Sequence, residues 1–113
     1  MKYLTLLLII GLAFSTTINI PSDYTTIQAG INASMDGDTV LVAQGTYLEN
    51  LILEKEIVLA SHALNDDLNT EWTNNENIQE TIISGTPEPV DPDYGSCLVI
   101  RDGNIAPKIL GFT

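Results

Sequence analysis

Two polar segments, 61–80 and 86–95, contain the side chains that are best suited to contact a ligand. Trp72 lies in the first segment among Asn, Asp and Glu residues, and Tyr94 lies near the end of the second. An aromatic ring in polar surroundings can stack on a sugar, and it can equally anchor a loop to the body of the fold. Trp72 and Tyr94 are therefore weak candidate ligand-binding residues, and for Trp72 we favour the anchoring role.

The same two segments contain candidate metal ligands. Asp91 and Asp93 stand close together in the second, and Asp66 and Asp67 in the first. Calcium prefers clusters of oxygen ligands, but the spacing of an EF-hand loop is absent from the sequence. We favour the interpretation that these are solvated loop acids, and a calcium site at Asp91 and Asp93 is the alternative. No other cofactor is indicated.

A catalytic group is not identified by the sequence. His62 is the single histidine and stands beside Ser61, but triad partners are defined by geometry in the fold and not by closeness in the chain. We expect His62 to be a polar residue at the exit of a strand. Glu49 and Asn50 look functional at first sight, yet we assign them and Tyr47 to the fold, with Tyr47 as an anchor at a corner.

The composition limits the classes of partner. Four Lys and Arg against fifteen Asp and Glu give a net charge of −11 over 113 residues. This excludes general nucleic-acid binding, which depends on basic side chains that neutralise phosphates. Cys97 is the only cysteine, so no intrachain disulfide can form, and we expect it to be a small buried residue in a strand.

The N-terminus has the layout of a secretory signal peptide over residues 1–15. Lys2 provides the positive start, an apolar run covers 4–14, and Ala13-Phe14-Ser15 offers small residues at the cleavage positions. A membrane anchor is the alternative, but this run is far shorter than the roughly 20 residues that span a bilayer. We expect a secreted or cell-surface protein, extracellular or periplasmic, with no membrane span after cleavage.

The residues that follow the signal predict one helix and a series of short strands. Thr25 or Thr26 is suited to cap a helix, and Gly37 is suited to end it in the left-handed C′ position. Its apolar face would contain Ile27, Ile31 and Met35, with Gln28 and Asn32 facing away. Apolar, β-branched runs predict strands at 18–20, 39–43, 48–53, 57–60, 81–85, 96–101 and 108–113. Turns are expected at 44–47 and 54–56, and the two polar segments are expected to project from the body of the fold.

In this order, the segments resemble the start of a right-handed parallel β-helix of the pectin-lyase-like superfamily, which includes pectate lyases and pectin methylesterases. The resemblance covers residues 18–113 and rests on IP-DYTTIQA, DGDTVLV, GTYLEN, IVLAS, TIISG and ILGFT. It implies an all-β solenoid whose first turn is capped by the short helix. Residues 16–113 would then be the cap and first rungs of an incomplete domain, because the sequence stops within an apolar strand.

The resemblance also sets the functional expectations. The chain would be the non-catalytic N-terminal part of a secreted protein that binds or processes extracellular polysaccharide, with pectin-like uronans as possible ligands. One alternative is a structural or adhesive cell-surface protein. Another is a pectin methylesterase or lyase whose active site lies beyond Thr113, where the catalytic residues of those families would fall. Whether the whole protein is an enzyme, and its oligomeric state, stay open.

Overall fold

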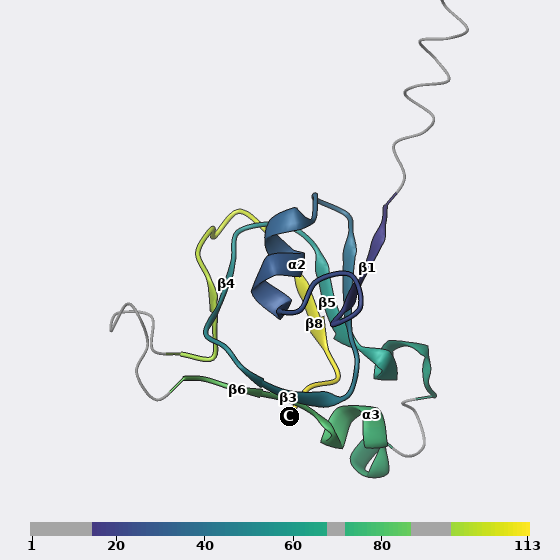
Figure 1. Ribbon diagram of the computed structural model, residues 1–113. Coiled ribbons are helices and arrows are strands. Elements are labelled where there is room, and N and C mark those ends of the chain that lie inside the picture. Colours follow the sequence, from purple (N-terminus) through teal and green to yellow (C-terminus); the bar gives the residue numbers. More distant parts are fainter. Residues whose placement is uncertain (1–14, 68–71, 87–95) are drawn as a thin grey trace, which may run out of the picture.

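The structure, a computed structural model, describes residues 15–67, 72–86 and 96–113 (Figure 1). Its strands are β1 (Thr17–Ile20), β2 (Thr39–Val42), β3 (Gly45–Leu48), β4 (Leu51–Leu53), β5 (Val58–Ser61), β6 (Thr81–Ser84), β7 (Leu98–Ile100) and β8 (Lys108–Leu110). Its helices are α2 (Ile27–Ala33) and α3 (Glu76–Gln79), with 3-10 turns η1 (His62–Asn65) and η2 (Trp72–Asn74). The expected signal peptide, 1–15, lies outside the described residues except for Ser15. None of the helices in the described ranges is long and apolar enough to cross a membrane.

The strands pair in parallel within three small sheets. The largest sheet has the order β1-β2-β5-β8, while β3 pairs with β6 and β4 pairs with β7. After β1 and β2, which pair with each other, each successive strand lies in a different sheet from the one before it, and the chain returns to the first sheet at β5 and again at β8. The register places Ile18, Val40 and Leu59 in one row across β1, β2 and β5. Such rows bring apolar residues that are distant in sequence into one core.

The core combines side chains from the strands and from α2. Its buried members are Ile18, Ile20, Ile27, Ile31, Val40, Val42, Leu51, Leu53, Ile57 and Leu59. Tyr47, Ile83, Leu98 and Phe112 pack against this cluster and are only partly buried. In Figure 1, α2 lies within the outline formed by the strands, and it packs against β1, β2 and β4. The buried face of the helix, formed by Ile27, Gly30 and Ile31, is thus part of the core.

Helix α2 begins as the sequence predicts and ends earlier. Thr26 is the N-cap, and its side chain accepts a hydrogen bond from the N–H of Ala29 at 3.1 Å. The C-cap is Ser34, so Met35 lies beyond the helix and is 74% exposed, although the sequence predicts it on the apolar face. Gly37 has the predicted positive φ of 91°, but it serves the turn after the helix and not the C′ position.

Two other local predictions are wrong. The expected turn at 44–47 is largely strand β3, which pairs with β6 through the register of Gly45 with Thr81. Cys97, expected to be buried within a strand, is exposed and precedes β7. Its Sγ accepts a hydrogen bond from the N–H of Gly85 at 3.2 Å. Both predictions rest on local residue type. In the structure, pairing with a distant segment determines the backbone conformation at these positions.

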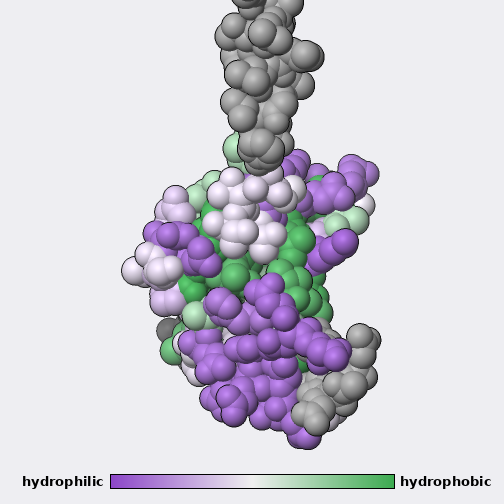
Figure 2. Space-filling view, turned by 90° about the vertical axis from the view of Figure 1, so that its right-hand side faces the viewer, coloured by the Kyte–Doolittle hydropathy of each residue, from purple (hydrophilic) through white to green (hydrophobic). Residues whose placement is uncertain are grey.

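The first polar segment projects from the body of the fold, as predicted. It contains η1, η2 and α3, and no residue of α3 is buried. Asp66 connects its two parts, because its carboxylate accepts hydrogen bonds from the side-chain amides of Asn75 and Asn77. Figure 2 shows hydrophilic side chains gathered over the lower part of this face, where Figure 1 places α3.

The expected fold class, an all-β solenoid, is wrong. The described residues form a small, compact, mixed α/β domain, about 20% helical, and they contain no solenoid or β-helix. The strands are only three or four residues long, and two of the three sheets contain just two strands. Short apolar runs separated by Gly and Asp turns report strand positions. They do not show whether the strands stack into a coil or whether a helix packs into the core, because both depend on tertiary packing.

Candidate functional site

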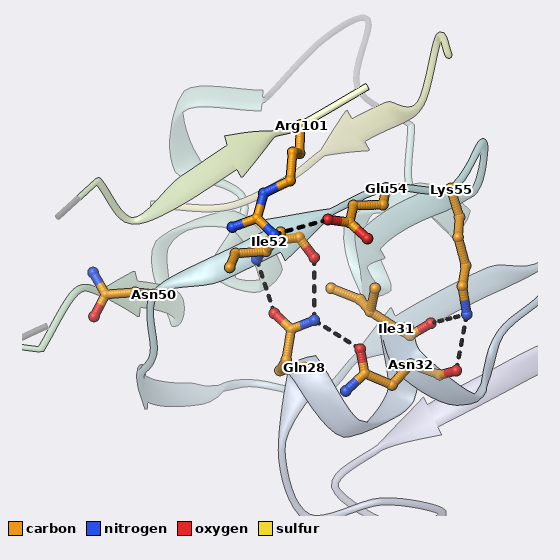
Figure 3. Close-up of a pocket in the computed structure, with 8 residues that line it drawn as sticks. All are labelled: Gln28, Ile31, Asn32, Asn50, Ile52, Glu54, Lys55 and Arg101. Atoms are coloured by element: carbon orange, nitrogen blue, oxygen red, sulfur yellow. Dashed lines mark hydrogen bonds and ion pairs between the residues drawn. The ribbon is translucent and has the colours of Figure 1, made fainter. Parts of the chain in front are cut away.

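A pocket of about 370 Å³ lies between α2 and the segments that contain β4 and β7 (Figure 3). Six of its eight lining residues have polar side chains and two are isoleucines: Gln28, Ile31, Asn32, Asn50, Ile52, Glu54, Lys55 and Arg101. A concave surface with a few convergent polar groups over an apolar wall is the usual form of a small-molecule site. We therefore take it as the candidate functional site.

Gln28 forms the junction between the helix and the strand. Its Nε2 donates to the carbonyl of Ile52 at 3.1 Å, and its Oε1 accepts from the N–H of Ile52 at 2.8 Å. Nε2 also donates to Oδ1 of Asn32 at 3.0 Å, one helical turn further on. The side-chain amide thus substitutes for a neighbouring strand at Ile52. The prediction that Gln28 faces away from the fold is wrong, because its side chain bonds to β4.

Both ends of α2 are held by the segment around β4. The carboxylate of Glu49 accepts from the N–H groups of Ile27 and Gln28 at 2.9 and 3.0 Å. At the other end, Nζ of Lys55 donates to the carbonyls of Ile31, Asn32 and Ser34 at 3.0, 2.8 and 2.5 Å. An anion at the N-terminus and a cation at the C-terminus also suit the helix dipole. The wall of the pocket that α2 provides is therefore fixed in place.

Arg101 and Glu54 form an ion pair at the other side of the pocket. Nη1 of Arg101 lies 3.1 Å from Oε1 of Glu54, and the two side chains are 43% and 52% exposed. An exposed pair of this kind contributes only about 0.2–1 kcal/mol to stability. An anion from solution could therefore replace Glu54 as the partner of Arg101.

Asn50 joins the pocket to the loops beside it. Its Nδ2 donates to the carbonyl of Ser96 at 3.1 Å, and its Oδ1 accepts from the N–H of Thr86 at 3.0 Å. These contacts place the flanks of the second polar segment next to the pocket. The segment's central part, 87–95, is outside the described residues.

The pocket concentrates positive charge in an acidic chain. Lys55 and Arg101 are two of the four basic residues in the whole sequence, and both line it, with Glu54 as the single carboxylate. That carboxylate is paired with Arg101. The pocket is therefore suited to binding a polar or anionic molecule.

The side chains that the sequence predicts as ligand contacts are not among those that the structure describes. Asp91, Asp93 and Tyr94 all lie in 87–95, outside the described residues. The backbone of Trp72 belongs to η2, and the structure does not describe its side chain. Within the described ranges, no group of three or more His, Cys, Asp or Glu side chains could hold a metal ion.

Asp66 has a role that is visible in the structure. Hydrogen bonds from the amides of Asn75 and Asn77 lower the pKa of its carboxyl group, and the nearby His62 contributes less. Ser61 is buried, and its Oγ accepts from the N–H of Ala63 at 3.2 Å. The polar residues around His62 thus stabilise the local chain, and His62 directly follows β5, as expected of a polar residue at the exit of a strand.

Tyr47 and Glu49 act in the fold, as predicted. The hydroxyl of Tyr47 donates to the carbonyl of Ala43 at 2.8 Å, and its ring packs against the core. Burial, followed by the negative charge of Glu49, raises the pKa of the Tyr47 hydroxyl. Glu49 caps α2 through its carboxylate, so its contacts serve the helix rather than a reaction.

Sequence reasoning missed the three residues that define the pocket, Gln28, Lys55 and Arg101. One signal was available: basic residues are so few here that any of them merits attention. Their spacing carried no information, because the pairing of β4 with β7 brings Arg101 to Glu54 across the intervening chain.

Comparisons with known proteins add no relative. No protein-family model matches the chain, and no curated protein or solved structure is significantly similar to it.

Proposed function

We propose that this chain is a binding domain for extracellular polysaccharide and that the pocket between α2 and β7 receives one sugar unit. The observation that carries the proposal is the lining of the pocket. Three side-chain amides and a guanidinium surround an apolar wall that Ile52 provides, with the buried side chain of Ile31 behind it. Amides and guanidinium groups hydrogen-bond to hydroxyl and carboxylate oxygens, while aliphatic side chains contact the C–H faces of a sugar.

The local charge supports an acidic sugar, such as the uronates of pectin. Arg101 can present a planar fork of N–H donors to a carboxylate, which Lys cannot do. In a chain with a net charge of −11, acidic ligands would be repelled from most of the surface, so a site with two cations favours them locally. Export through the N-terminal signal belongs to the same proposal, because the ligand is extracellular.

A second candidate function is that of a structural or adhesive cell-surface protein. The observation that favours it is the exposure of Ile100 on β7 and Ile109 on β8, at 46% and 41%. Exposed isoleucines on edge strands suit contact with another protein surface. A role in pectin methylester or lyase chemistry has no support in this pocket, whose one carboxylate is already ion-paired.

Titration of the purified chain with oligogalacturonates, followed by calorimetry or NMR, tests the proposal. We expect binding, and we expect Arg101→Gln to weaken it by about tenfold, the effect of losing one charged hydrogen-bonded pair. Lys108→Gln is the matched control, because it removes the same charge from exposed β8, outside the pocket. Equal losses for the two variants, or no binding to any oligosaccharide, would contradict the proposal.

A further inference from the structure

The backbone positions of Glu54 and Arg101 are fixed by strand pairing and do not depend on the ion pair between their side chains. Glu54 directly follows β4 and Arg101 directly follows β7, and these strands are paired in register through Leu53 and Ile100. In addition, the N–H of Arg101 donates to the carbonyl of Leu53 at 3.0 Å. The backbone hydrogen bonds therefore hold Arg101 at the pocket whether or not Glu54 carries a charge.

The other cation of the pocket is already used. Nζ of Lys55 has three donors, and it makes three hydrogen bonds to carbonyls at the end of α2. Figure 3 shows Lys55 turned toward the carbonyls of Ile31 and Asn32, with Arg101 and Glu54 together at another edge of the pocket. A bound anion would consequently meet Arg101 as its principal partner.

We propose that Glu54 occupies the place at Arg101 that the carboxylate of an acidic sugar takes on binding, and so sets the selectivity of the pocket between acidic and neutral saccharides. This inference rests on the proposed function. The pair is half exposed and therefore weakly held, so a ligand carboxylate with two oxygens toward the guanidinium can replace it. After the exchange, Glu54 remains close to the ligand, and its negative charge opposes acidic sugars in particular.

The consequence is a specific change in selectivity when Glu54 loses its charge. Glu54→Gln keeps the shape of the side chain and removes both the competition for Arg101 and the repulsion of an acidic ligand. The ratio of the affinities for an acidic and a neutral ligand should therefore rise. A residue that merely positioned Arg101 would give the opposite result, because its loss would weaken binding of the acid.

The experiment compares two probes with the same sugar backbone, trigalacturonate and its fully methyl-esterified form, by calorimetry on the full chain. We expect Glu54→Gln to raise the acid-to-ester affinity ratio by up to about fivefold, the size of one exposed charge–charge interaction. Arg101→Gln should lower this ratio below the wild-type value. Glu56→Gln, an exposed carboxylate two residues along that does not line the pocket, should leave it unchanged. Thermal unfolding of each variant confirms that it is folded.

Two kinds of failure are distinguishable. If wild-type protein binds a trimer but Glu54→Gln lowers the ratio or leaves it unchanged, the role assigned to Glu54 is wrong and the proposed function stands. The role of Glu54 is equally wrong if Glu56→Gln raises the ratio by the same factor. If no variant binds either trimer, the proposed function fails, and the inference that rests on it fails too.

Discussion

A row of aligned side chains crosses the largest sheet, and it is buried at the β1 end and exposed at the β8 end. Ile18, Val40, Leu59 and Ile109 are aligned by the strand register, yet the first three are 8%, 0% and 0% exposed and Ile109 is 41% exposed. All four are apolar and occupy equivalent positions. The difference lies in their surroundings, because α2 packs against β1 and β2, while β8 pairs only with β5 among the described residues.

The edges of the same sheet differ in a similar way. At β1, the N–H of Asn19 donates to the carboxylate of Asp23, and the carbonyl of Asn19 accepts from the N–H of Asp23, both at 2.8 Å. The turn after β1 therefore uses backbone groups that another strand would need. Residues 19–38 therefore do two things at this end of the sheet. They bury the apolar side chains of β1 and β2, and they occupy backbone groups of β1 that could otherwise pair with another strand.

The largest expected effect is a difference in stability between substitutions near β1 and substitutions at β8. Ile31→Ala removes a side chain that is 2% exposed from the contact between α2 and the core. We expect it to lower the free energy of unfolding by about 2–5 kcal/mol, as large-to-small core changes do. Ile109→Ala, at the β8 end, should cost less than about 1 kcal/mol because much of its surface is already in water. Urea unfolding of both variants measures this, and equal losses would show that the two sides are packed alike.

A smaller effect is expected from the bonds that hold α2. Glu49→Gln removes the charge that two N–H groups at the start of the helix share, and we expect a loss of about 1–2 kcal/mol. Glu80→Gln removes the same charge from an exposed residue after α3 and should change stability by less than about 0.5 kcal/mol. Urea unfolding again provides the measurement. A Glu49 variant as stable as the Glu80 variant would show that α2 needs only its apolar contacts.

The smallest effect depends on pH. Asp38 is buried and accepts from the N–H groups of Met35 and Thr16, both at 2.8 Å, and these bonds lower the pKa of its carboxyl below the ordinary value of 3.8. Since the folded-state pKa is the lower one, Asp38 stabilises the fold above about pH 3.8. This contribution is lost as the pH falls through the lower folded-state value. Asp38→Asn should therefore be less stable than wild type at pH 5.5, with a gap that narrows toward pH 2.5. Denaturant unfolding at the two pH values measures the gap, and a constant gap would contradict the assignment.

Local features of the sequence determined a good part of this protein. Thr26 as N-cap, the burial of Ile27 and Ile31, the approximate positions of the strands and the projection of the first polar segment all follow from residue type and spacing. These features depend on backbone conformation and on hydrogen bonds within a few residues. The signal peptide, the ligand roles of Trp72 and Tyr94, calcium at Asp91 and Asp93, and the pectin-lyase-like resemblance stay predictions.

Only the tertiary structure decided the fold class and the site. The number of strands in each sheet, and the entry of α2 into the core, made this a mixed α/β domain where the family resemblance implied an all-β solenoid. Gln28 bonds to Ile52, and Arg101 meets Glu54, because packing and strand pairing bring together segments that are distant in the chain. The free energy of such strand pairing and packing is the sum of many weak contacts between residues that are distant in sequence. No single local pattern in the sequence can therefore predict which segments will meet.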